Sequence, residues 1–565
     1  MTFNKTMLAA SLTLALAGQA LAAVSSSEAA QLGTSLTQVG AEAAANADGS
    51  IPAYSGGLTT PPAGFKAGDS MRPDPYAGEQ PLLVITGKNA AQYQGALTAT
   101  TAELLKRFPD FRVDLYPTHR SVALPQAVLD NTRKNALSAT TLAGGMAVDK
   151  VLPGIPFPIP KSGAEAMWNF LLRYQGVNIA TKYDSWNVDS AGVAALSTTG
   201  QAFINYAIYE DMNKPISAKD TYYQMKLHYT GPARRAGEAI MLRDAANPLE
   251  QPRKAWQYLP GQRRVKLAPN LAYDTPNPGT SGAGTYDDVF VFNGALDRFD
   301  WKLVGKQEMI VPYNTYRLTY QPDARALTTP NFLSPDHVRW EKHRVWVVEG
   351  SLKAGERHIY AKRRFYLDED SWNIVLGEFY DSRGELWRVS VAYLKNYYDL
   401  PTTWSALDVF HDLQARRYHV QNLDNEESNT IDFTQAVEGT TVSMQTVSDE
   451  ACGACSGTGA KSGTLPRVCP TCQGSGMETS TSGGVFAVSE PCHDCRGRGL
   501  IVEEPCPVCG GSGRGRSTRS MQVRIPAGVT ANIQSTLTIP AGATTGAISV
   551  PIIDDTAVEG PETFT

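Results

Sequence analysis

The sequence has no cysteine outside residues 452–509, although it runs to 565 residues and holds eight cysteines in all. Its eight histidines are scattered, and residues 23–425 contain neither a His-Glu-x-x-His nor a Gly-x-Ser-x-Gly motif. These absences remove the usual signatures of zinc hydrolases and of serine hydrolases, so we expect no enzyme. A net charge of -5 gives no electrostatic case for a nucleic-acid partner.

Long apolar runs are also scarce, and the main one lies at the amino terminus. Lys5 precedes the apolar run Met7–Ala17, and Ala20-Leu21-Ala22 follows as a cleavage site. We interpret residues 1–22 as a secretory signal peptide; the alternative is a buried amino-terminal helix. No later run reaches the length of about 18 residues that crosses a bilayer. We therefore expect a periplasmic or secreted protein without a transmembrane segment.

The cysteines form four Cys-x-x-Cys pairs, each followed by x-Gly-x-Gly. Two cysteines at this spacing aim both sulfurs at one point, and a tetrahedral zinc ion needs two such half-sites. Four half-sites predict two Zn²⁺ ions, and the glycines suit a backbone with φ values that other residues avoid. A disulfide framework and a Cys-x-x-Cys redox motif are the alternatives. We expect His493, which lies inside one pair, to be a bystander.

Residues 431–529 resemble the cysteine-rich domain of DnaJ-type co-chaperones, with Ile431–Gly439 and Val523–Val529 similar to the strands that enter and leave that domain. The resemblance implies unfolded polypeptides as partners and, for the module by itself, a cytoplasmic location. No His-Pro-Asp tripeptide occurs, so the J-domain of that family is missing. The resemblance also implies the metal ligands, which are Cys452, Cys455, Cys506 and Cys509 for the first zinc and Cys469, Cys472, Cys492 and Cys495 for the second.

Residues 23–425 form a larger body in which helices come first and strands follow. We expect helices around 29–45, 97–108 and 162–174, the last with Ser162 as N-cap and Glu165 at capping-box spacing. β-branched and aromatic residues predict strands at 221–229, 239–243, 255–258, 263–267, 301–311, 315–320, 339–349, 360–367, 374–380 and 386–393. The expected class is α+β, mainly β: a large curved antiparallel sheet, then a two-zinc cysteine-rich β-hairpin module and a short β fragment.

A second resemblance covers the large body. Trp256–Val265, with Gly154–Pro158 and Tyr366–Trp372, is similar to a periplasmic family of unknown function related to the LolA and LolB lipoprotein carriers. It implies an incomplete β-barrel with a helical lid and an apolar interior that takes a lipid or lipoprotein acyl chain. Candidate ligand-binding residues are Trp256, Tyr258, Trp346 and Trp372; the alternative is that they fill a core. Residues 275–284 are expected to form a hairpin or lid loop.

The remaining segments connect or end these two parts. Residues 426–430 are polar and suit a linker. Residues 530–565 resemble a truncated Calx-beta repeat, a β-sandwich that binds calcium through acidic loops. Its acidic positions are Asp554, Asp555, Glu559 and Glu562. Because only two or three strands of that sandwich are present, we expect Ca²⁺ binding to be weak at best.

Two functions follow from these patterns, and neither excludes the other. The first is a DnaJ-like zinc module that binds unfolded proteins, and the second is a periplasmic carrier of a hydrophobic ligand. We expect a fusion of both. The alternatives are a carrier whose zinc module is inert, and an artificial chimera with no single function.

Overall fold

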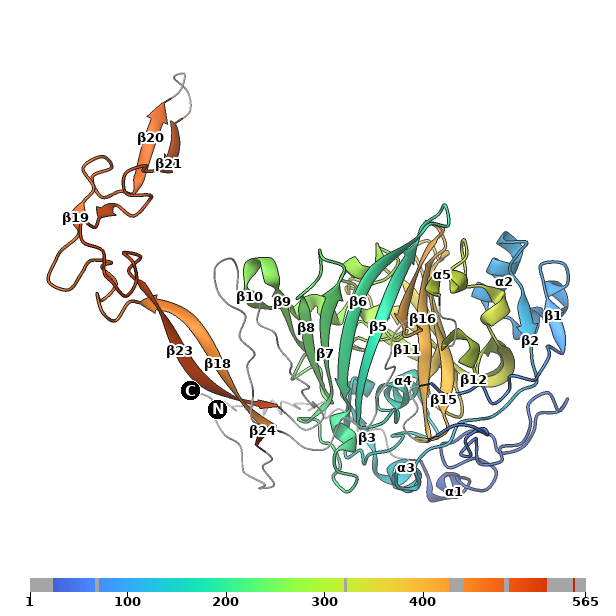
Figure 1. The fold of residues 1–565 in the computed structure, drawn as a ribbon. Helices are drawn as coiled ribbons and strands as arrows, with labels where there is room; N and C mark the ends of the chain where they lie inside the picture. The colour runs from blue at the N-terminus through green and yellow to red at the C-terminus, as the bar shows by residue number, and fades with distance from the viewer. Residues whose placement is uncertain are drawn as a thin grey trace, which may run out of the picture. The chain divides into compact units, whose positions relative to one another are not determined.

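The computed structural model describes residues 24–66, 71–319, 323–425, 440–481, 487–525 and 552–553. The chain divides into two units, Met1–Ala436 and Val437–Thr565, which Figure 1 shows as a large sheet with helices and as a set of hairpins. The signal peptide predicted at 1–22, the linker at 426–430, the strand at 431–439 and all four Calx-beta positions lie outside the described residues.

The first unit is built on one 15-stranded sheet that is antiparallel at nearly every pairing. In spatial order its strands are β1 (Leu83–Ile85), β2 (Val113–Leu115), β12 (Trp340–Leu352), β13 (Lys362–Asp368), β14 (Ile374–Tyr380), β15 (Leu386–Tyr397), β16 (Thr402–Asp412), β17 (Arg417–Leu423), β5 (Asn178–Val188), β6 (Ala194–Asn205), β7 (Thr221–Gly231), β8 (Ala239–Ala245), β9 (Lys254–Leu259) and β10 (Arg264–Leu267), with β11 (Phe299–Pro312) paired to β12. The sheet is open and ends at β10. This confirms the mainly-β class with a large antiparallel sheet.

Among the residues of the first unit that the structure describes, five short α-helices and a small hairpin accompany the sheet. They are α1 (Ser26–Ala29), α2 (Ala99–Arg107), α3 (Gln126–Ser138), α4 (Gly163–Leu171) and α5 (Ala324–Leu327), with the hairpin of β3 (Thr140–Leu142) and β4 (Ala147–Asp149). Helix α4 packs against β11 and β12 and is almost fully buried. Ser162 caps it by accepting the backbone N–H of Glu165. The Glu165 carboxylate accepts from the N–H of Lys161 and not from that of Ser162, so only half of the predicted capping box is formed.

Two predicted elements are wrong. The structure has only α1 where a helix was expected over 29–45, because Gly33 and Gly40 take positive φ values of 87° and 88°. A Cβ on Gly40 would lie 1.7 Å from the carbonyl oxygen of Pro158, so close approach of two segments replaces the helix. Where a strand was expected over 315–320, the described residues 315–319 contain a 3₁₀ turn at Tyr316–Thr319.

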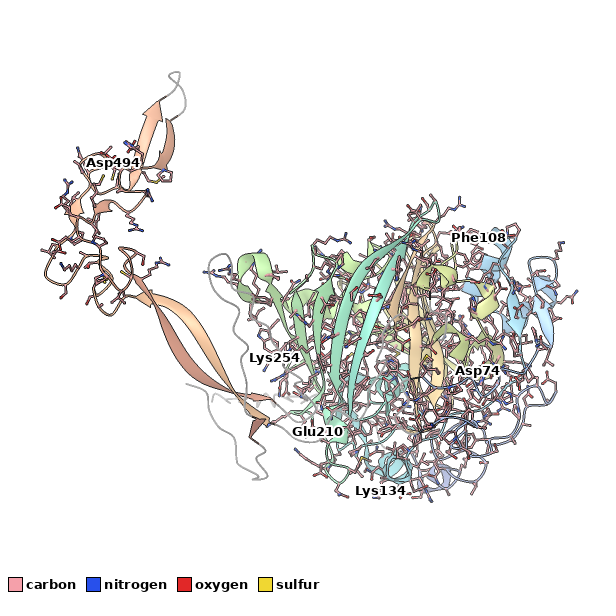
Figure 2. The ribbon with its side chains drawn as sticks, viewed as in Figure 1. Asp74, Phe108, Lys134, Glu210, Lys254 and Asp494 are labelled. Carbon is pink, nitrogen blue, oxygen red and sulfur yellow. The ribbon has the colours of Figure 1, made fainter. Side chains whose placement is uncertain are left out.

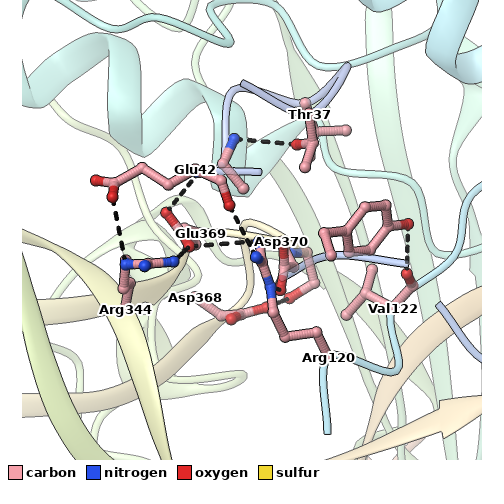
Figure 3. A network of polar contacts seen from close by, with 12 residues as sticks. Thr37, Glu42, Arg120, Val122, Arg344, Asp368, Glu369 and Asp370 are labelled. Atoms are coloured by element: carbon pink, nitrogen blue, oxygen red, sulfur yellow. Dashed lines mark hydrogen bonds and ion pairs between the residues drawn. The ribbon is translucent and has the colours of Figure 1, made fainter. Parts of the chain in front are cut away.

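A buried ionic network ties the amino-terminal segment to the sheet (Figure 3). Its centre is the turn between β13 and β14, where Asp370 receives two hydrogen bonds of 2.7 and 2.9 Å from Arg120. Arg120 also donates to the backbone oxygen of Glu42 at 2.8 Å, and Glu369 pairs with Lys306 at 2.8 Å. Each charge in this turn therefore has a partner. Among the described residues the turn is not one of the groupings that could hold a metal.

The described residues of the second unit form hairpins. Strand β18 (Thr440–Ala451) pairs with β23 (Arg514–Ile525) and with β24 (Ile552–Ile553), while β19 (Arg467–Val468) pairs with β22 (Leu500–Ile501) and β20 (Met477–Thr481) with β21 (Ala487–Pro491). The cysteines lie on the turns between these strands. Because the pairing is nested, β18 and β23 bring the first and last cysteine pairs together, and the inner hairpins bring the middle two together.

Candidate metal centres and an internal cavity

The structure gathers the eight sulfurs into two groups of four. One group is Cys452, Cys455, Cys506 and Cys509, the other is Cys469, Cys472, Cys492 and Cys495, and the sulfurs of each group lie within 4.8 Å of one another. This is the grouping that the resemblance implied. The two groups are separate buried clusters.

The spacing of the sulfurs separates metal binding from disulfide bonding. The distances are 3.8 Å for Cys455–Cys509 and for Cys469–Cys492, and 3.6 Å for Cys472–Cys495. A disulfide needs about 2.05 Å, and all eight cysteines are free. A tetrahedron with Zn–S bonds of about 2.3 Å places its sulfurs about 3.8 Å apart. The donor set therefore fits two zinc ions, each held by four thiolates.

The glycines after each pair shape the turn around the sulfurs. In all four turns the second glycine donates its backbone N–H to the second cysteine sulfur, as Gly476 does to Cys472 and Gly513 to Cys509, both at 3.3 Å. Gly476 has φ 72°, and a Cβ there would lie 2.5 Å from the carbonyl oxygen of Gly497 on the facing turn. Glycine is thus required at this position for two reasons: the backbone conformation and the close contact between the two turns.

These N–H donors also act on the acidity of the thiols. Burial raises the pKa of Cys509, but the N–H of Gly513 and the neighbouring sulfurs outweigh it and lower that pKa to about 6. The same balance lowers the pKa of Cys472 to about 7. Burial dominates at Cys452 and raises its pKa to about 11. Each group thus has a thiol close to ionisation, and a bound metal displaces the remaining protons.

His493 lies beside the second group. Its side chain is 72% exposed, with Nδ1 2.9 Å from a carboxylate oxygen of Glu478 and Nε2 3.1 Å from Asp494. Hydrogen bonding to Glu478 raises the pKa of His493. One possible ligand atom from each of Glu478, Cys492 and His493 lies within 4.8 Å of the other two. The spacing of the cysteines did not predict this grouping. The four sulfurs already complete a tetrahedron, so His493 is not needed as a ligand.

The first unit contains an internal cavity of about 60 Å³, well above the 10–15 Å³ that one water molecule needs. Its apolar walls include Ile204, Met225, Leu242, Phe290 and Trp404. These side chains come from β6, β7, β8 and β16 and from the segment that follows β10. The cavity therefore lies between one face of the sheet and a covering loop.

That covering loop includes the segment predicted as a hairpin or lid. Pro276 and Thr285 form an isolated bridge, and Asn277 and Gly279 line the cavity. The loop is tied down at Gly279, whose carbonyl oxygen accepts from Asn187 at 3.0 Å, and at Gly282, whose carbonyl oxygen accepts from Arg388 at 2.7 Å. The cavity is thus covered by a loop that includes two short 3₁₀ helices, Pro278–Thr280 and Tyr286–Asp288.

Polar groups also reach the cavity. Arg235 donates to Thr198 at 2.8 Å and to Glu238 at 3.2 Å, and its guanidinium lies 4.0 Å from the ring centre of Tyr229. His419 has its Nδ1 2.7 Å from Asn187 Oδ1, and burial lowers the pKa of His419 to about 3. The histidine is therefore neutral near pH 7. The cavity lining is thus mainly apolar, with Arg235 and His419 as hydrogen-bonding groups.

The four aromatic residues proposed as ligand contacts are not among the cavity-lining residues. Trp372 is fully buried and donates its indole N–H to the backbone oxygen of Val39 at 3.0 Å. Trp346 stacks on it with ring centres 6.0 Å apart. Trp256 and Tyr258 lie on β9, on the face opposite to Ile240 and Leu242, which line the cavity. Aromatic residues that do face the cavity, such as Trp404, can be identified only when the strand register is known.

An open antiparallel sheet with an internal cavity, followed by a cysteine-rich module with two four-sulfur centres, defines a composite protein of two classes. The chain belongs to the family described as protein of unknown function (DUF1329), which matches residues 84–448. The DnaJ central domain matches residues 452–513. Among the described residues no helix combines the length and the apolar character needed to cross a membrane.

Relatives match the two parts separately. An uncharacterized protein of Pseudomonas aeruginosa is 41% identical over 421 residues, which are 74% of this chain and 92% of that protein. Chaperone protein DnaJ 2 of Cutibacterium acnes is 62% identical over 115 residues, which are 20% of this chain and 30% of that one. The chain thus spans less than a third of the DnaJ chaperones it matches. A LolA superfamily protein of Nitrosomonas europaea is similar in structure, with a TM-score of 0.27, 11% identity, and coverage of 44% of this chain and 85% of that one.

Proposed function

We propose that the first unit is a periplasmic carrier that holds a hydrophobic ligand, such as a lipid or lipoprotein acyl chain, in the cavity beside β6, β7 and β8, and that it performs no catalysis. The observation that carries the proposal is the void lined by Ile204, Met225, Leu242 and Trp404. Each methylene group moved from water into such a void contributes about 0.8 kcal/mol. An acyl chain therefore gains affinity from burial alone.

A substitution that fills the cavity tests this proposal. Ala202 is buried on β6 and lines the cavity, so Ala202→Phe places a ring in the ligand's space. Ala195 lies on the same strand and is exposed, which makes Ala195→Phe the matched control. Lipid is extracted from each purified chain and measured by mass spectrometry. We expect ligand in the wild type and in the control and a loss in Ala202→Phe; equal yields in all three, or none, would contradict the carrier function.

We further propose that the zinc module binds unfolded polypeptides. Apolar side chains on its surface support this, since Leu465, Val508 and Val468 are 90%, 71% and 59% exposed. Exposed apolar groups are costly in water and mark sites of interaction. The missing His-Pro-Asp tripeptide means that this activity would be holding and not stimulation of a partner ATPase.

The test is suppression of aggregation of a reduced, unfolding client protein. We expect Leu465→Ser with Val508→Ser to lower the suppression. Leu82 and Leu249 are 71% and 51% exposed on the first unit, so serine at both of these positions gives the matched control. A double variant in the zinc module that protects the client as well as the wild type does would refute the proposed binding surface.

A further inference from the structure

The outer face of β7–β10 carries cations placed directly beside one another. Arg243 on β8 lies opposite Lys254 on β9, and Lys226 of β7 lies on the same face, opposite Met241. Like charges directly opposite on neighbouring strands destabilise a sheet. Two nearby acidic residues, Glu238 and Asp244, do not relieve this repulsion, because they lie on the other face and pair with arginines there.

The same face bears apolar side chains at the open end of the sheet. Val265 lies opposite Tyr258, and Leu267 lies opposite Trp256. Val265 and Leu267 are 63% and 70% exposed, and contiguous exposed apolar groups mark sites of interaction. Met241 continues the row on β8. Figure 2 labels Lys254 beside this end of the sheet.

We propose that this outer patch, formed by Arg243, Lys254, Trp256, Tyr258, Val265 and Leu267, docks the protein on the surface of an anionic lipid bilayer. Lysine and arginine attract anionic headgroups. Tryptophan and tyrosine are suited to the interface, where one side of the ring is apolar and the other is wet. The unfavourable Arg243–Lys254 pairing is explained if an anionic surface neutralises it.

A bilayer fits these observations better than an acidic protein does. The patch combines exposed aliphatic groups with cations on one face, which is the pattern of membrane-surface elements. The preference for a bilayer also rests on the proposed carrier function, since an acyl chain must be collected from a membrane or delivered to one. Cavity and patch lie on opposite faces of β8, with Ile240 and Leu242 on one face and Arg243 on the other, so a docked protein keeps its cavity free.

Vesicle co-sedimentation of the full chain tests the proposal, with phosphatidylcholine alone or mixed with phosphatidylglycerol. We expect binding to the mixed vesicles only, weakened by salt. Arg243→Gln with Lys254→Gln should lower the partition coefficient about 25-fold, since each cation near an anionic surface contributes about fivefold. This variant removes a repulsion, so its thermal unfolding should match or exceed that of the wild type. Val265→Ser with Leu267→Ser should also weaken binding.

The matched control replaces two exposed cations elsewhere, Lys88→Gln with Arg133→Gln, and should bind mixed vesicles as the wild type does. Equal binding to both vesicle types, an unchanged Arg243→Gln/Lys254→Gln variant, or capture of polyglutamate without any vesicle binding would each overturn the proposal. Lipid extraction from the same variants keeps the two proposals distinguishable: vesicle binding without extractable ligand would refute the carrier and leave the patch standing.

Discussion

Replacing Cys472 with serine should remove the zinc ion of the inner centre, formed by Cys469, Cys472, Cys492 and Cys495, and leave the outer one. The reason is that the two four-sulfur groups share no ligand. A serine hydroxyl is a poor substitute for a thiolate at a tetrahedral zinc site. The two centres are nested along the chain, however, so losing the inner ion lengthens the loop that the outer ion closes.

The magnitude follows from loop lengths. The inner centre joins positions 23 residues apart and the outer one positions 54 apart. Treated as cross-links, they remove about 3.4 and about 4.2 kcal/mol of chain entropy from the unfolded state. When the inner centre is closed, the loop that the outer centre must close is shortened by 23 residues, to about 31 free residues. When the inner centre is lost, that loop returns to 54 residues, and closing it costs only about 0.5 kcal/mol more. The affinity of the outer centre should therefore fall only about twofold.

The assay is metal content of the purified chain by mass spectrometry, followed by competition with a chromophoric chelator. We expect two zinc ions in the wild type, one in Cys472→Ser, and an outer dissociation constant raised about twofold. His493→Ala is the control and should keep both ions, since the four sulfurs suffice. Loss of both ions from Cys472→Ser would refute the independence of the centres, and loss of one from His493→Ala would show that the histidine is a ligand.

Three further predictions rest on single contacts. Gly476→Ala should weaken inner zinc binding in the same chelator competition, whereas Gly453→Ala, which meets no atom within 4 Å, should not. Arg363→Met, which removes the arginine from two buried carboxylates, should cost about 3–5 kcal/mol of unfolding free energy in urea titration. Arg383→Met, which removes a side chain that is 71% exposed, should leave the unfolding free energy nearly unchanged. Burial raises the pKa of Asp408 to about 7, so the protonated carboxyl contributes fully to the unfolding free energy below about pH 4 and this contribution is lost as pH rises through 7. Asp408→Asn should therefore flatten the decline of the unfolding free energy between these pH values. A variant whose unfolding free energy falls with pH as the wild type's does would refute this prediction.

The zinc half-sites could be predicted from sequence because their geometry is local, whereas the pairing of half-sites across 23 and 54 residues came only from the resemblance. Each half-site lies within one turn, so the Cys-x-x-Cys-x-Gly-x-Gly spacing carries both the ligands and the backbone conformation. Strand β7 could be predicted because apolar and polar residues alternate along it from Tyr223 to Tyr229. Strand β16 gave no such signal, since every residue of Thr402–Asp412 is buried and both faces of the strand have the same character.

The resemblance implied an apolar interior, but the residues that line the cavity could not be predicted, for a different reason. Trp404 and Trp256 are equivalent as residue types, and only the strand register decides which of them points inward. A β-bulge that shifts the register between Tyr393 and Leu394 leaves no mark that a sequence pattern would reveal. The helix expected at 29–45 failed because the contact of Gly40 with Pro158 joins segments more than a hundred residues apart, beyond the reach of local propensity.

The two units are stabilised by different forces, and this allows their proposed functions to be separated by metal removal. The first unit holds a large hydrophobic core, whereas the buried clusters found in the described part of the second unit consist of cysteines. A chelator should therefore unfold the zinc module, because its binding free energy is also its folding free energy, and leave the sheet intact. We expect client protection to disappear after chelation and to return with zinc, while extractable lipid and vesicle binding stay unchanged. If chelation released the lipid as well, the cavity would depend on the zinc module, and the two units would have to be treated as one functional system.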